Sequence, residues 1–186
     1  MLFRSYARQG QEYVGAVVGD DTVVVDLAAA ESALARKEKR KAQPFFTDML
    51  SLLEAGAKGR KAAAAAAALA VERIGKGGKP DGRLSHLIGK VRLRAPVPNP
   101  RKIFCLAGNF QDHIEEGGAK MEQQDKETPR VFMKPPTSTV IGPGDAIKIP
   151  PVARAIDWEG ELAVVIGRKA KGVKAKDALQ IGRAHV

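Results

Sequence analysis

The sequence has almost no cysteine, since Cys105 is the single thiol in 186 residues. One thiol excludes an internal disulfide framework and a zinc site built from several cysteines, and it favours a reducing compartment. Cys105 lies inside the apolar run Ile103–Ala107. We therefore interpret it as a small core residue and not as a nucleophile.

Long apolar runs are also missing. The longest, Ala62–Val71, is nearly all alanine, and it is shorter than the about 20 residues that a helix needs to cross a bilayer. The opening residues Met1–Ser5 lead into polar residues instead of the apolar core of a secretory signal. We therefore expect a cytoplasmic protein that makes no membrane contact.

Acidic and aromatic residues are scarce relative to basic ones. The chain has 31 Lys and Arg against 21 Asp and Glu, a net charge of +10, and only 5% aromatic residues. Basic residues gather at 36–41 and 58–61, without interleaved aromatic rings that stack on bases and without a known nucleic-acid-binding motif. We interpret both groups as solvated helix faces. A basic nucleic-acid-binding module is the non-enzyme alternative, and it would bind with a steep salt dependence.

The first half of the sequence predicts a small domain over residues 1–95, in which strands precede helices. Alternating side chains over residues 2–26, interrupted by the turn Gly19–Asp21, predict an antiparallel sheet. Good helix formers dominate residues 27–74. Within that range, Pro44 marks the expected start of a second helix.

Three expectations concern the end of this domain. An alanine-rich helix is predicted over Lys58–Ile74, and because alanine has little surface to bury, we expect this helix to contribute little to packing. His86 falls in a loop-like stretch and is expected at the surface. Val91–Arg94 is predicted to form a short strand.

A proline-rich linker is predicted over residues 96–100, because prolines this close together interrupt a helix or a central strand. Beyond it, residues 101–180 alternate short apolar segments with turns that contain Gly and Pro, which predicts a second, β-rich domain. The expected fold class is therefore α+β.

Two carboxylates open the last apolar segment of this second domain. If residues 157–167 form a strand, Glu159 and Glu161 point to the same face, because side chains at i and i+2 do so. Two carboxylates about 5 Å apart repel each other by about 3 kcal/mol at an effective dielectric constant of about 20. A divalent cation such as Mg²⁺, Ca²⁺ or Mn²⁺ would offset this repulsion. Alternatively, both glutamates are solvated on an edge strand and neutralised by neighbouring arginines.

A second candidate group lies upstream. His113 and Glu116 have i,i+3 spacing, so they share one face if this turn is helical. A carboxylate beside an imidazole orients the ring and helps it to accept a proton from water. The alternative is an ordinary histidine beside an acidic residue at a helix end. Lys134 follows three apolar residues and is either a substrate-binding ammonium at a strand end or a solvated lysine.

Four segments of the second domain occur in an order and at a spacing that resemble the fumarylacetoacetate hydrolase family. They are Lys102–His113, Val131–Pro136, Ile141–Asp145 and Asp157–Gly167. The amino-terminal hairpin resembles the small leading domain of bacterial members. The resemblance implies a mixed β-roll or barrel for the second domain, incomplete at its carboxyl end in this sequence.

The resemblance also implies roles for individual residues. Glu159 and Glu161 match two metal ligands for Mg²⁺, and Mn²⁺ or Ca²⁺ are further possibilities. His113 and Glu116 match a dyad that activates water, and Lys134 lies in the right segment to assist substrate binding. The substrate implied is a small diketo acid, the setting is the catabolism of aromatic compounds, and the full-length protein is expected to form a homodimer.

The expected activity is metal-dependent hydrolysis of a C–C bond in an acylpyruvate-like or fumarylacetoacetate-like substrate. A divalent ion would polarise the carbonyl and stabilise the departing enolate, while activated water attacks the other carbonyl. The dyad favours hydrolysis, because an isomerase needs no activated water. The alternatives within the same fold are an isomerase of hydroxyhepta-dienedioate type, an oxaloacetate decarboxylase and a ureidoglycolate lyase-like enzyme.

The end of the sequence departs from the family pattern. Members carry a third metal ligand, an aspartate on a later strand, and we find no match for it here because Asp177 resembles the start of a helix. Residues 181–186 translate one reading frame of a common sequencing adapter, so we expect an adapter-derived tail. We therefore expect this chain to be inactive and prone to aggregation through an unpaired strand edge.

Overall fold

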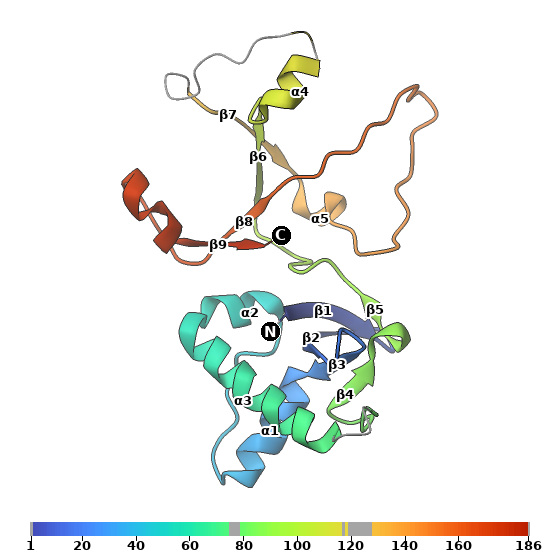
Figure 1. Ribbon diagram of the computed structural model, residues 1–186, viewed down its shortest axis with the longest axis vertical. Helices are drawn as coiled ribbons and strands as arrows, with labels where there is room; N and C mark the ends of the chain where they lie inside the picture. Colours follow the sequence, from blue (N-terminus) through green and yellow to red (C-terminus); the bar gives the residue numbers. More distant parts are fainter. Residues whose placement is uncertain (1, 75–78, 117, 119–127, 186) are drawn as a thin grey trace. The chain divides into compact units, whose positions relative to one another are not determined.

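The computed structural model describes residues 2–74, 79–116, 118 and 128–185 (Figure 1). It divides into two compact units. One comprises the residues up to Val97 together with those from Gly142 onward, and the other comprises Pro98–Ile141. Helices and antiparallel strands both occur, which confirms the α+β class. In the described part of the chain, no helix is both long enough and apolar enough to span a membrane.

A five-stranded antiparallel sheet forms the first part of the chain, and it confirms the strands predicted over residues 2–26 and 91–94. Its order is β4-β3-β2-β1-β5. The strands are β1 (Leu2–Arg8), β2 (Gln11–Val18), β3 (Val23–Asp26), β4 (Ser85–Leu87) and β5 (Arg92–Leu93), and the short 3₁₀ helix η2 (Ile88–Lys90) joins the last two.

The sheet is strongly curled. Two strands separate β1 from β4, yet the ring of Tyr6 on β1 lies 6.4 Å from the ring of His86 on β4. Gly15 permits this curvature, because a Cβ atom at that position would lie 2.3 Å from a methyl group of Val24. His86 is consequently buried, at 8% exposure. The prediction of a surface histidine was wrong, because β4 places this side chain against the inside of the curled sheet.

Three helices follow the first strands: α1 (Leu27–Lys37), α2 (Met49–Glu54) and α3 (Gly56–Ile74). The helix predicted to begin at Pro44 begins instead at Met49. Its N-cap is Asp48, whose carboxylate accepts a hydrogen bond of 2.8 Å from the amide of Ser51. An acidic cap satisfies one of the amides that a helix start leaves unpaired, and this local signal outweighs the proline.

The alanines of α3 are a central part of the core, which corrects the expectation that this helix contributes little to packing. Ala63, Ala66, Ala67 and Ala70 are buried together with residues of α1 and of the sheet. Alanine has little area of its own, but a row of alanines lets two helix backbones approach closely. Gly59 extends this row, because a Cβ atom there would lie 2.8 Å from the carbonyl oxygen of Leu52.

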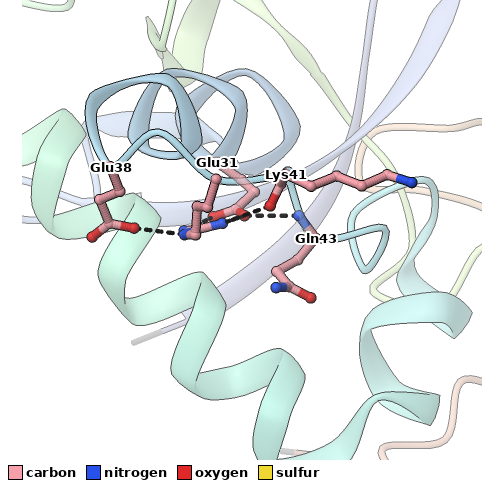
Figure 2. Close-up of polar contacts among 5 residues, drawn as sticks. Glu31, Glu38, Lys41 and Gln43 are labelled. Carbon is pink, nitrogen blue, oxygen red and sulfur yellow. Dashed lines mark hydrogen bonds and ion pairs between the residues drawn. The ribbon is translucent and has the colours of Figure 1, made fainter.

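A buried carboxylate fixes the end of α1 (Figure 2). Glu31 is 1% exposed, and both of its oxygens accept hydrogen bonds from the Arg40 guanidinium, at 2.6 and 3.2 Å. The amide of Gln43 donates a third bond of 2.8 Å. Burial raises the pKa of the Glu31 carboxyl, but the bonds from Arg40 and Gln43 outweigh it, so the pKa lies below its ordinary value.

The chain reverses after α1 through a Schellman motif. The Arg40 amide donates to the Ala35 carbonyl at 2.9 Å, and the Lys39 amide donates to the Arg36 carbonyl at 3.3 Å. Lys39 adopts a left-handed conformation with φ of 53°, the place where glycine usually stands. This turn carries Arg40 back to Glu31, so the backbone motif and the buried ion pair support each other.

The remaining elements are short. The second unit contains β6 (Ile103–Ala107), α4 (Gln111–Glu116), β7 (Arg130–Lys134) and α5 (Pro136–Thr139). After it come β8 (Ala163–Ile166), the 3₁₀ helix η4 (Ala175–Gln180) and β9 (Gly182–His185). The strands form two separate two-stranded ribbons, β6-β7 and β8-β9, so the part of the chain described here does not show the single β-roll that we expected.

We predict that Ala66→Leu destabilises the protein by about 2 kcal/mol, because added methylene groups overpack a filled core. Ala65→Leu is the matched control, since Ala65 is exposed on the same helix and its substitution changes helix propensity only slightly. Urea unfolding of both variants measures the difference. Equal midpoints for the two variants would contradict the packing role of α3.

We also predict that Glu31→Gln lowers the free energy of unfolding by about 2 kcal/mol at neutral pH. The buried carboxylate that accepts from Arg40 and Gln43 then becomes a neutral amide, and hydrogen bonds to charged groups are worth about 1.5 to 3 kcal/mol, while Arg40 keeps its contact of 2.6 Å with Glu38. Glu72→Gln is the control, since Glu72 forms an exposed pair with Lys37 at 3.8 Å and such pairs contribute little.

Acid unfolding separates the two variants further. Because the folded-state pKa of Glu31 is lowered, its contribution is present above the ordinary value of 4.5 and is lost as pH falls through the folded-state value. The difference in stability between Glu31→Gln and the unsubstituted chain should therefore shrink in this acidic range. A difference that does not change with pH would contradict the assignment.

Candidate active site

Lys134 lies at the end of a ribbon in the second unit. The strands β6 and β7 pair in antiparallel register, with Ile103 opposite Lys134 and Ala107 opposite Arg130. Lys134 is the last residue of β7 and is exposed. Its ammonium group is therefore open to an anionic ligand, as the substrate-binding interpretation requires, and the structure equally accommodates a solvated lysine.

His113 and Glu116 lie together on the helix α4. Gly108 turns the chain after β6 with φ of 68°, and the helix begins with a bond of 3.2 Å from the Ile114 amide to the Phe110 carbonyl. The Nδ1 atom of His113 is 3.7 Å from a carboxylate oxygen of Glu116. The i,i+3 contact expected from the sequence is therefore present. Both side chains are largely exposed, at 63% and 78%.

This pair has the parts of a proton-transfer group. Glu116 can hold one imidazole nitrogen of His113 while the other exchanges a proton with a ligand or water. The contact is an ion pair when the imidazole is protonated. At 3.7 Å the contact is longer than a hydrogen bond.

Glu159 and Glu161 do not lie in a strand. The segment before Ala163 has no regular secondary structure, and both side chains are exposed. The prediction that a strand over residues 157–167 turns them to one face was therefore wrong at its amino-terminal end. Strand β8 covers only the four residues that β9 pairs, Ala163–Ile166, because an extended segment without a neighbour does not form ladder hydrogen bonds.

Glu159 and Glu161 are chemically suitable ligands for a hard cation, because both offer carboxylate oxygens. Two carboxylates alone do not make a complete metal site. Within the described ranges, no group of three or more His, Cys, Asp or Glu side chains is arranged to hold a metal ion. Glu159 and Glu161 belong to the first unit, whereas His113, Glu116 and Lys134 belong to the second.

Sequence reasoning missed the role of Asp145. Its carboxylate accepts a bond of 2.8 Å from the Gly142 amide, which closes the turn predicted over Ile141–Asp145, and it forms ion pairs with Arg92 and Arg94 near β5. The hydrogen bond from Arg92 and the bond from the Gly142 amide hold the pKa of Asp145 below its ordinary value. The sequence signal that could have indicated this role is the pair of alternating basic residues Arg92 and Arg94, which can pair with an acidic residue.

Gly142 explains why this turn can approach β5. A Cβ atom at that position would lie 2.9 Å from the Leu93 carbonyl oxygen and 3.1 Å from the Arg94 Cα atom. Arg94 also donates to Glu12 of β2 at 3.0 Å. The turn is therefore fixed to the curled sheet by close backbone contact and by charge.

Many large apolar side chains of the ribbons are exposed. The three apolar side chains of β7, Val131, Phe132 and Met133, are exposed, as are Phe104 on β6 and Val164 on β8. Trp158, beside the candidate glutamates, is 87% exposed. Patches of this kind mark surfaces that contact other protein segments or ligands.

Comparison with known proteins shows that the candidate site residues lie in a segment that matches a known family. Residues 102–181 match the family described as fumarylacetoacetate (FAA) hydrolase C-terminal. The oxaloacetate tautomerase YisK of Bacillus subtilis is 37% identical over 180 residues, which is 96% of this chain and 56% of that protein. A mitochondrial oxaloacetate tautomerase of Xenopus laevis is 38% identical over 96 residues, which is 50% of this chain and 28% of that protein.

A solved structure shares the fold. The fumarylacetoacetate hydrolase of the psychrophile Exiguobacterium antarcticum superposes with a TM-score of 0.60 at 21% identity, over 97% of this chain and 52% of that one. This chain thus spans about half the length of the B. subtilis relative and of the structural neighbour.

The Asp145 contacts generate a testable expectation. Substituting Arg92→Gln should raise the pKa of the Asp145 carboxyl toward 3.8, because it removes the strongest hydrogen bond to the ionised form. Carboxyl NMR during a pH titration measures this shift. Arg130→Gln, in the other unit, should leave the value unchanged, and the same pKa in both variants would contradict the described contacts.

Proposed function

Because residues 102–181 belong to the fumarylacetoacetate hydrolase family, we propose that this chain contributes the catalytic groups of an enzyme that acts on small oxo acids, with oxaloacetate tautomerisation as its reaction. The observation that carries the proposal is the 37% identity to a protein named oxaloacetate tautomerase over 96% of this chain. Tautomerisation is an isomerisation, so this proposal agrees with the isomerase alternative. We prefer it to C–C bond hydrolysis as the reaction of this enzyme.

The His113–Glu116 pair fits this reaction. Keto–enol exchange moves a proton between a carbon and the oxygen of the neighbouring carbonyl, so the enzyme needs a group that accepts and returns one proton. An imidazole can do both near neutral pH, because its neutral form accepts a proton and the imidazolium that results returns it. Glu116 lies 3.7 Å from Nδ1, so it stabilises the imidazolium that forms when the ring holds the proton. No activated water is required, and the dyad therefore acts as a base and acid for the substrate.

Substrate charge gives Lys134 a role. Oxaloacetate carries two carboxylates, and an exposed ammonium at the end of β7 attracts one of them as a point charge. Lys134 thereby binds the substrate and orients it, without itself moving a proton.

Glu159 and Glu161 supply two carboxylate ligands for Mg²⁺ in this proposal. Their oxygens match the ligand preference of hard cations, and Mn²⁺ or Ca²⁺ would also suit them. When bound, the ion polarises the substrate carbonyl and stabilises the enolate form.

Hydrolysis of an acylpyruvate-like substrate is the second candidate. The family description and the name of the structural neighbour favour it. In that reaction, His113 takes its proton from water and Glu116 again holds the ring. The two candidates share their residues and differ in what the imidazole deprotonates.

We predict that Glu159→Gln and Glu161→Gln in the full-length gene product each abolish the Mg²⁺-dependent part of oxaloacetate tautomerisation, because amides are weaker ligands for a hard cation. The decay of the enol absorbance on adding freshly dissolved enol, with and without Mg²⁺, measures this. Glu12→Gln, in the sheet, should retain Mg²⁺ dependence. A Mg²⁺ response that is equal in all three variants would exclude both glutamates as ligands.

The dyad has its own matched control. Glu116→Gln should lower kcat by about 10²-fold, the usual order for general acid–base groups. Glu115→Gln on the same helix should change it little, since among the described residues the Glu115 carboxylate accepts from Gln111 at 2.7 Å and not from His113. Parallel assays with an acylpyruvate separate the two functions, and rapid hydrolysis without acceleration of tautomerisation would contradict the tautomerase proposal.

A further inference from the structure

An open pocket of about 560 Å³ lies on the curled sheet, outside the segment that matches the family. Arg8 and Gln9 line it at the end of β1, Ser85 and His86 line it from β4, and Lys90 lines it from η2. None of the described residues around it is Asp or Glu. Two permanent cations, Arg8 and Lys90, therefore face the pocket without a carboxylate in its lining.

Two polar atoms of the residues that line this pocket lack partners. The Arg8 Nε atom and the His86 Nε2 atom are buried, and within the described part of the chain neither has a hydrogen-bond partner. His86 is 8% exposed. Buried polar atoms without partners are rare in folded proteins, so these two need an explanation. The Arg Nε–H is a donor.

The nearest carboxylates are already engaged elsewhere. Asp26 caps α1 by accepting from the Ala29 amide at 2.9 Å. Asp81 accepts from the backbone amides of the three residues that follow Gly82, at 2.6 to 3.2 Å. Neither lines the pocket. No acidic residue in the described lining of the pocket therefore balances the positive charges of Arg8 and Lys90.

The state of His86 agrees with this picture. Burial lowers its pKa, and the nearby Arg8 lowers it further, whereas Asp26 and Asp81 oppose the change. A lowered pKa favours the neutral imidazole, which presents one N–H donor. The described lining thus combines the guanidinium of Arg8, the ammonium of Lys90, the imidazole of His86 and the hydroxyl of Ser85.

We propose that this pocket binds a small oxyanion, either a carboxylate or a phosphate, through Arg8, His86 and Lys90. The Arg8 guanidinium offers a fork of donors that matches the two oxygens of a carboxylate or phosphate. Lys90 adds a point charge from the rim, where it is exposed. The proposal is independent of the oxaloacetate reaction, because it uses none of the candidate catalytic residues.

Titration of the full chain with inorganic phosphate, malonate and chloride at equal ionic strength tests it. The imidazole C–H signals of His86 should shift in a saturable way with phosphate or malonate, and its pKa should rise, because an anion favours the imidazolium. Saturation by one of the two identifies a phosphate or a carboxylate site, and saturation by both supports the oxyanion class. A response equal to that of chloride would overturn the proposal.

Matched variants make the test specific. Lys90→Met should weaken the binding of the effective anion by about tenfold, since hydrogen bonds to charged groups contribute on this scale. Arg8→Met should weaken it at least as much. Lys58→Met, an exposed lysine on α3, removes the same charge elsewhere and should not change the affinity. If Arg8→Met does not fold, Lys90→Met decides, and equal affinity in Lys90→Met and Lys58→Met would refute the site.

Discussion

Close approach of small side chains is the constraint on which the first unit depends. Ala63, Ala66 and Ala70 let α3 lie directly against its neighbours, and Gly59 removes the side chain where the backbone of α2 is nearest. Gly15 does the same inside the sheet, where any Cβ atom would collide with Val24. Because interiors are packed as densely as crystals, a single added methylene group at such a position is felt. The curl of the sheet, and with it the burial of Tyr6 and His86, follows from this close packing.

The features that depend on neighbours in sequence could be predicted. Alternation over residues 2–26 and the turn at Gly19–Asp21 gave the strands, and the helical composition after Leu27 gave the helices. What depends on neighbours in space could not be predicted in the same way. The alanines of α3 have a helical pattern whether or not another helix covers them, and the three residues of β4 are too few to show that His86 faces inward.

The candidate site shows the same difference between features that depend on neighbours in sequence and features that depend on neighbours in space. The contact of His113 with Glu116 is local, because i,i+3 spacing on one helical turn brings the side chains together without help from the rest of the fold. The arrangement of Glu159 and Glu161 is not local. A shared face needs a strand, a strand needs a partner, and β8 has a partner only from Ala163 onward. Spacing alone therefore predicted a pair of carboxylates suited to a hard cation, but it did not predict their geometry.

Two groups of buried polar atoms in this chain differ in how their hydrogen bonds are satisfied. Glu31 accepts three hydrogen bonds from Arg40 and Gln43, so both of its oxygens are satisfied by the protein itself. The Nε2 atom of His86 and the Nε atom of Arg8 are buried, and the described protein offers neither a hydrogen-bond partner. An unpaired buried donor costs about 1 to 3 kcal/mol, and a bound oxyanion would remove that cost. The satisfied carboxylate therefore serves stability, whereas the unsatisfied atoms are the basis of the proposed anion site.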